Sequence, residues 1–218
     1  MKIHKISHCC LVIDLKTKEG QSRRILLDPG FYSVEKHSKV NKIDIVLITH
    51  EHADHFHIES LKELLKNHPE VEIITNTGVG AILVREGITH HVMEHGDIID
   101  TKGVHIEAYG KDHALMHKSI PPAANVGFFI QNTFFFPGDA FTLINKEIKL
   151  LALPVAGPWM KISEALDYAL TLKPIKAFPV HDAGSTSISF VHSFVERVLG
   201  PKGIEFINLE DGGTIDFT

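Results

Sequence analysis

The feature that most constrains this chain is the run Thr-His-Glu-His-Ala-Asp-His at residues 49–55, which follows directly on the apolar residues 45–48. The apolar segment is short and rich in β-branched residues, which is typical of a buried strand. We therefore expect the chain to leave a sheet edge at Thr49. Side chains alternate along an extended chain, so His50 and His52 point to the same side and can reach one metal ion.

Two further ligand types follow within the same run. Asp54 and His55 lie beyond the expected turn and can face a second ion nearby. An amphipathic helix over residues 58–66 would then hold the loop against the apolar strand. Ordinary surface histidines are the simpler interpretation for a single residue. Three His and one Asp crowded at one strand end would waste polar groups unless something bound them, so the run favours a metal site.

Composition restricts the remaining possibilities. The 218 residues contain no linker rich in Ser, Gly or Pro and no repeat, so we expect one domain over 1–218. The only cysteines, Cys9 and Cys10, are adjacent, and neither a signal peptide nor a long apolar span is apparent, which favours a reducing cytoplasmic setting without a membrane. With 22 Lys and Arg against 27 Asp and Glu, no basic block stands out, so nucleic acid is disfavoured as a partner.

The pattern of apolar residues predicts an α/β protein. Strands and helices alternate in two halves, each of which begins with strands and continues with helices, an order that indicates a layered α/β sandwich. The expected strands cover residues 3–15, 24–28, 43–48, 71–75, 98–109, 126–131, 134–136, 149–153, 177–180, 204–209 and 214–217. The expected helices cover residues 58–66, 78–86, 163–172 and 187–199.

Three more potential ligands follow expected strands. Asp139 comes after an aromatic strand broken by Pro-Gly, His181 follows residues 177–180, and His113 follows a strand that ends at 109. Taken singly, the Asp is more typical of a turn and each His of a hydrogen-bonded structural residue. Taken together with the run at 49–55, they could complete two coordination shells, because that run alone supplies too few ligands.

The order of these motifs resembles that of the metallo-β-lactamase-fold metallohydrolases. The chain shows His-x-His-x-Asp-His after a strand, then a distant His, a Gly-Asp after an aromatic strand, and a late His. Several shorter stretches are similar to the ascorbate-6-phosphate lactonase-like branch of that superfamily. They lie at residues 7–13, 26–30, 125–128, 136–139, 153–159 and 179–182.

The resemblance implies a four-layer αβ/βα sandwich and a dinuclear metal centre. It implies that one ion is held by His50, His52 and His113, the other by Asp54, His55 and His181, and that Asp139 bridges them. His117 is the alternative to His113, because it lies only four residues further along. His8 either lies near the metals or is an inward-facing structural residue.

The reaction that this resemblance implies is hydrolysis by a metal-activated hydroxide, with Asp54 orienting or deprotonating the water. The nitrogen-rich ligand set favours two Zn²⁺ ions, and Mn²⁺ or Fe²⁺ are alternatives. We expect a small-molecule ester, lactone or phosphoester as substrate. A nucleic-acid-processing nuclease and a non-enzymatic metal-binding protein are the competing functions, and a homo-oligomer is left open.

Some residues near the expected site have two interpretations. Lys111, Lys118 and Lys161 could receive a phosphate or carboxylate group of the substrate, although loop lysines are usually only solvated. Trp159, the only tryptophan, could form a wall of the substrate site or pack in the interior.

Overall fold

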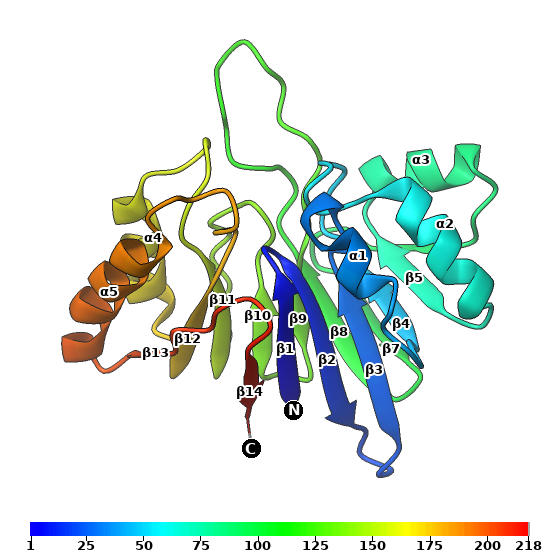
Figure 1. Ribbon diagram of the computed structural model, residues 1–218, viewed down its shortest axis with the longest axis horizontal. Helices are drawn as coiled ribbons and strands as arrows, with labels where there is room; N and C mark the ends of the chain where they lie inside the picture. The colour runs from blue at the N-terminus through cyan, green and yellow to red at the C-terminus, as the bar shows by residue number, and fades with distance from the viewer. Residues whose placement is uncertain (218) are drawn as a thin grey trace.

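The computed structural model describes residues 1–217, so Thr218, the last residue of the expected domain, lies outside the described residues. It contains two seven-stranded sheets that pack face to face, with helices on both outer sides (Figure 1). The expected four-layer αβ/βα sandwich is confirmed. Among the helices of this described part, none combines the length and the hydrophobicity of a membrane span.

The first sheet has the strand order β14-β1-β2-β3-β4-β5-β6. Its strands are β1 (Lys2–Ser7), β2 (Cys10–Lys16), β3 (Ser22–Leu27), β4 (Ile45–Leu47), β5 (Glu72–Thr75), β6 (His91–Val92) and β14 (Thr214–Asp216). The strands β3 to β6 are mutually parallel, whereas β14, β1, β2 and β3 pair antiparallel.

The second sheet has the order β13-β12-β11-β10-β9-β8-β7. Its strands are β7 (Ile98–Thr101), β8 (Val104–Tyr109), β9 (Gly127–Ile130), β10 (Phe134–Phe136), β11 (Leu150–Pro154), β12 (Lys176–Val180) and β13 (Glu205–Phe206). The strands β10 to β13 are parallel, and β7 to β10 form an antiparallel meander.

The helices are divided between the two outer faces (Figure 1). The first sheet is covered by α1 (Val34–His37), α2 (Ile58–Asn67) and α3 (Thr77–Arg85), and the second by α4 (Ile162–Leu172) and α5 (Ile188–Leu199). Short 3₁₀ turns lie at Phe31–Ser33 and Gly200–Lys202.

Alternation along β4 explains why this strand is apolar on both faces. Ile45 and Leu47 point into the core between the two sheets, whereas Val46 and Ile48, the residue after the strand, point into the core beneath α2 and α3. All four side chains are fully buried, and each such burial contributes about 1.5–3 kcal/mol. A strand with helices on one side and a sheet on the other therefore reads as a continuous apolar run.

The expectation of one strand over residues 3–15 is wrong, because the structure divides this stretch into β1 and β2. The chain reverses between Ser7 and Cys10, and His8 takes a left-handed backbone conformation with φ +56°. No glycine or proline marks this turn, so the apolar pattern runs through it without interruption. The strand expected over 204–209 is shorter as well, since pairing with β12 ends at Phe206.

A buried ion pair ties the first sheet to the segment after β12. The Lys5 side chain is 0% exposed, and its Nζ donates to both carboxylate oxygens of Asp182 at 2.7 Å and to the Leu209 carbonyl at 3.3 Å. His192 Nε2 lies 3.0 Å from Asp182 Oδ2. Burial raises the pKa of Asp182, but His192 and Lys5 outweigh it and hold this pKa below its usual value.

We expect Lys5→Met to lower the free energy of unfolding by about 3–5 kcal/mol, because it leaves the Asp182 carboxylate buried without its cation. Lys176→Met is the matched control, since Lys176 pairs with Glu205 on the surface and should change stability by less than about 1 kcal/mol. Urea denaturation of the two variants and the parent chain measures both effects. Equal losses in the two variants would contradict a stabilising role for the buried pair.

Candidate metal centre

Potential metal ligands meet at one edge of the sandwich because the strands that precede them run in the same direction. The strands β4, β10 and β12 each lie in a parallel part of their sheet, and β8 runs the same way as β10 because β9 is antiparallel to both. The side chains that follow these strands therefore gather above the carboxyl ends of both sheets. They are His50, His52, Asp54 and His55 after β4, His113 after β8, Asp139 after β10 and His181 after β12.

The first group consists of His50, His52 and His113. One nitrogen from each ring lies within 4.8 Å of the others, and His50 Nε2 is 3.1 Å from His52 Nδ1. His50 and His113 are buried, and His52 is half-buried. Three neutral imidazoles at this spacing can hold one transition-metal ion.

The second group consists of Asp54, His55 and His181, and His8 joins it. Asp54 Oδ2 lies 3.4 Å from His181 Nε2, 3.8 Å from His55 Nε2 and 3.3 Å from His8 Nε2. Atoms of all four residues lie within 4.8 Å of one another. This group combines nitrogen and oxygen donors, a set that suits a divalent transition-metal ion.

Asp139 lies between the two groups. Its Oδ1 is 3.2 Å from His55 Nε2, and its Oδ2 is 2.8 Å from His181 Nε2 and 3.3 Å from His113 Nε2. The Asp139 side chain is only 2% exposed. This carboxylate can therefore contact an ion in either group.

The hydrogen-bond inventory of these residues fits a bound metal. His55 Nε2, His113 Nε2, His181 Nε2 and Asp139 Oδ1 are buried but make no hydrogen bond. These atoms lie within ion-pair distance of one another, but their geometry is not that of hydrogen bonds. Buried polar atoms in proteins almost always have a hydrogen-bond partner. Converging lone pairs of this kind are satisfied by shared cations.

The electrostatics of the cluster are those of a site that attracts positive charge. Burial raises the pKa of Asp139, but His55, His113 and His181 outweigh it and hold this pKa well below the usual value. Burial lowers the pKa of His181, yet Asp139 and Asp54 outweigh burial and raise this pKa to about 9. The carboxylates therefore favour cationic neighbours, whether protons or metal ions.

Asp28, within the motif at residues 26–30, supports this candidate centre, although the sequence did not single it out. It is fully buried and accepts hydrogen bonds from Thr49 N at 2.8 Å, Thr49 Oγ1 at 2.7 Å and His55 Nδ1 at 2.7 Å. The bond to Nδ1 turns His55 Nε2 toward Asp139. Carboxylates commonly orient metal-binding histidines in this way. The only sequence signal was Asp-Pro-Gly after an apolar strand.

The backbone is strained at three of these positions. His8, Asp28 and His181 have φ values of +56°, +44° and +61°, a left-handed region that non-glycine residues rarely occupy. Such conformations cost about 1–3 kcal/mol each and cluster at functional sites. Gly138, with φ +66°, lies against Asn125, whose Oδ1 would be 2.3 Å from an added Cβ and accepts from the backbone N–H of Asp139.

The structure separates the two candidates for the distal histidine. His113 is buried in the first group, whereas His117 is exposed and its Nδ1 pairs with Ser119 Oγ. Trp159 is 8% exposed, and its ring lies 5.8 Å from the rings of both His113 and His181. It therefore borders the centre and is largely buried as well. Lys111, Lys118 and Lys161 are exposed.

Known proteins are similar to this chain in sequence. A family model described as beta-lactamase superfamily domain matches residues 2–181. Protein Rv0786c of Mycobacterium tuberculosis is 32% identical over 188 residues, which cover 84% of each chain. The UPF0173 metal-dependent hydrolase MJ1163 of Methanocaldococcus jannaschii is 25% identical over 148 residues, which cover 64% of this chain and 67% of that one.

Solved structures agree in fold. The metallo hydrolase Igni18 from Ignicoccus hospitalis superimposes with a TM-score of 0.75 at 19% sequence identity, covering 100% of this chain and 99% of that chain. The metallo-beta-lactamase fold protein YhfI from Bacillus subtilis gives a TM-score of 0.73 at 14% identity, covering 98% of each chain. Because this family model matches residues 2–181, the chain belongs to the family described as beta-lactamase superfamily domain.

Proposed function

We propose that this protein is a metal-dependent hydrolase with a two-ion centre that acts on a small ester, lactone or phosphoester. The observation that carries the proposal is the position of Asp139, a buried carboxylate within 3.3 Å of histidines from both ligand groups. His50, His52 and His113 would hold one ion, and Asp54, His55 and His181 the other. Relatives named metal-dependent hydrolases support the same class.

Bound divalent ions would lower the pKa of water and polarise the carbonyl or phosphoryl oxygen of the substrate. The nitrogen-rich donor set favours Zn²⁺, with Mn²⁺ or Fe²⁺ as alternatives. The protein's own contribution is a rigid, mostly buried arrangement of ligands, so little reorganisation is needed when charge develops on the substrate.

Asp54 is the carboxylate suited to handle the attacking water. Its side chain is 30% exposed, whereas that of Asp139 is 2% exposed, so Asp54 can accept a hydrogen bond from water at the mouth of the site and orient it. His8 holds Asp54 in place. Because Ala183 N donates to His8 Nδ1 at 3.3 Å, the proton of a neutral His8 lies on Nε2, 3.3 Å from Asp54 Oδ2.

The direct test is to load the purified protein with Zn²⁺ or Mn²⁺ and to measure metal content together with hydrolysis. We expect two equivalents per chain, turnover of at least one carboxylic ester, lactone or phosphodiester, and loss of turnover on chelation that re-addition of metal restores. Metal uptake that never exceeds about one equivalent would contradict the two-ion centre. Two bound ions without turnover on any substrate would favour a metal-binding protein, and preferential cleavage of single-stranded RNA would favour a nuclease.

A further inference from the structure

Large apolar side chains are exposed in the two segments that border the metal centre. Phe31 and Tyr32, in the 3₁₀ turn after β3, are 62% and 47% exposed. Leu115, Met116 and Ile120, in the loop after His113, are 60%, 40% and 49% exposed. We call these five residues the apolar rim. Exposed apolar side chains mark a binding surface when they gather around one site.

One side of the rim is held directly against the second ligand group. The Tyr32 ring lies 4.9 Å from the His8 ring, which in turn lies 4.2 Å from the His181 ring. The Phe31 ring lies 5.8 Å from Tyr32, and Phe31 N donates to the Ala53 carbonyl at 2.7 Å, within the ligand-bearing loop. Tyr32 is therefore separated from His181 only by His8, and Phe31 lies next to Tyr32.

The other side of the rim is a loop that starts at the first ligand group. It projects above the sheets over the site edge (Figure 1), and backbone hydrogen bonds close its base, from His113 N to Ala123 O at 2.9 Å and from Asn125 N to Lys111 O at 3.0 Å. Ala114 N also donates to Asp139 O at 2.8 Å. The loop thus presents its apolar side chains from an anchored base beside His113.

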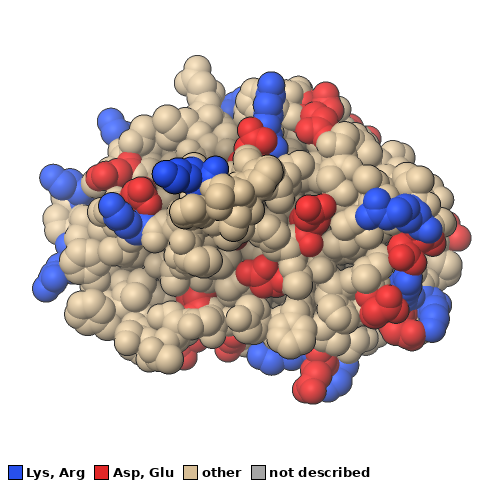
Figure 2. Space-filling view, turned by 90° about the horizontal axis from the view of Figure 1, so that it is seen from above, with Lys and Arg blue, Asp and Glu red and all other residues tan. Residues whose placement is uncertain are grey.

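The lysines near this site, Lys111 and Lys118, are exposed loop residues, and rigidly held positive charge is scarce. Within residues 1–217, Lys5 is the one buried Lys or Arg side chain, and Asp182 already pairs with it. Seen from above, uncharged side chains cover most of the centre of the molecule, and most Lys and Arg lie toward its margins (Figure 2). A substrate that presents an anionic group away from the metals would find few rigid cationic partners here.

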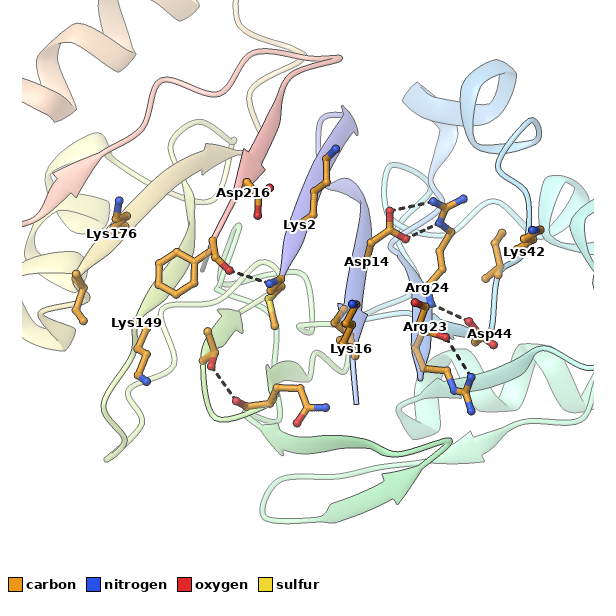
Figure 3. Close-up of a pocket in the computed structure, with 18 of the residues that line it drawn as sticks. Lys2, Asp14, Lys16, Arg23, Arg24, Lys42, Asp44, Lys149, Lys176 and Asp216 are labelled. Carbon is orange, nitrogen blue, oxygen red and sulfur yellow. Dashed lines mark hydrogen bonds and ion pairs between the residues drawn. The ribbon is translucent and has the colours of Figure 1, made fainter. Parts of the chain in front are cut away.

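Basic residues gather instead at the opposite ends of the strands. A broad groove there is lined by Lys2 at the start of β1, Lys16 at the end of β2 and Lys149 before β11 (Figure 3). Lys176, at the start of β12, belongs to the same groove. Because the metal centre lies at the carboxyl ends of β4, β10 and β12, these cations cannot contact a substrate bound to it.

We propose that the substrate is a neutral ester or lactone whose acyl or alkyl part is apolar and binds against the apolar rim. This inference rests on the proposed function. Hydrolysis would join the oxygen of water to the acyl carbon, break the acyl C–O bond and return a proton to the alcohol oxygen. The apolar part would remain between Tyr32 and the loop that carries Leu115, which explains why these side chains are exposed beside a polar centre.

The test compares a series of p-nitrophenyl esters, from acetate through butyrate to hexanoate, with the metal-loaded protein. We expect kcat/KM to rise with chain length by up to about fourfold per methylene that becomes buried. Tyr32→Ser and Leu115→Ser should flatten this dependence. Val84→Ser is the matched control, because Val84 is an exposed apolar residue on α3 outside the rim, and it should leave the dependence unchanged.

A second measurement does not depend on turnover. Butyrate and hexanoate, as product analogues, should bind the metal-loaded protein with increasing affinity in calorimetry, and the increase should be lost in Tyr32→Ser. Hydrolysis of all esters at the same kcat/KM would overturn this inference and leave the proposed function intact, whereas no hydrolysis of any ester, lactone or phosphodiester would remove both. A concentration-dependent dimer that Leu115→Ser abolishes would assign the rim to a second copy of the chain instead.

Discussion

Asp139→Ala should remove both metal ions together and abolish hydrolysis. Asp139 lies 3.2 Å from His55, 3.3 Å from His113 and 2.8 Å from His181, so its loss takes a ligand from each group. It also removes the negative charge between two cations that would otherwise repel each other. We expect metal affinity to fall by at least about 100-fold at both sites, since even loss of an indirect partner costs 10–100-fold. Metal analysis after dialysis, together with kinetics, measures this.

His181→Ala and His117→Ala are the comparison variants, because the first should lose one ion and the second should lose none. His181→Ala should keep about one equivalent of metal, because His50, His52 and His113 remain, while turnover falls by orders of magnitude. His117 is exposed and pairs only with Ser119 within the described residues, so His117→Ala should retain both ions and full activity. Circular dichroism excludes unfolding. If Asp139→Ala retained two ions and parental turnover, Asp139 would be only a turn residue.

The architecture was predictable because it follows from local patterns. A short apolar run such as residues 45–48 is typical of a strand that is buried on both faces. The ligand-rich loop that follows it must therefore start at a sheet edge. The same reasoning placed Asp139 and His181 after strands. That these strand ends share one metal centre came from the resemblance, since the partners of a strand cannot be derived from that strand alone.

The supporting residues could not be predicted because their roles arise from long-range pairing. Lys5 and Asp182 are 177 positions apart, and neither residue type indicates a buried ion pair in advance. The turn at His8 also lacks the glycine or proline that would reveal it. His8 reaches Asp54 only because this turn bends the chain into a left-handed conformation, which the surrounding contacts stabilise.

Asp28 is the clearest case of a supporting residue whose role arises from long-range pairing. Asp28→Ala should have a large effect on both stability and metal binding. The substitution leaves Thr49 N and His55 Nδ1 buried without their acceptor, and each unsatisfied group costs about 1–3 kcal/mol. We therefore expect the free energy of unfolding of the metal-free protein to fall by about 2–6 kcal/mol. Urea denaturation measures this loss.

Metal binding separates an orienting role of Asp28 from a purely structural one. Without the hydrogen bond to Nδ1, the His55 ring is no longer held with Nε2 toward Asp139, so the affinity of the second site should fall about 10–100-fold. Asp14→Ala is the matched control, because the Asp14 side chain is 41% exposed and pairs with Arg24 at the surface, where loss of the pair costs less than about 1 kcal/mol. Chelator competition gives the affinities. If both variants bound metal as tightly as the parent chain, Asp28 would stabilise the fold without orienting His55, and the aim of that ring would have to come from the packing around it.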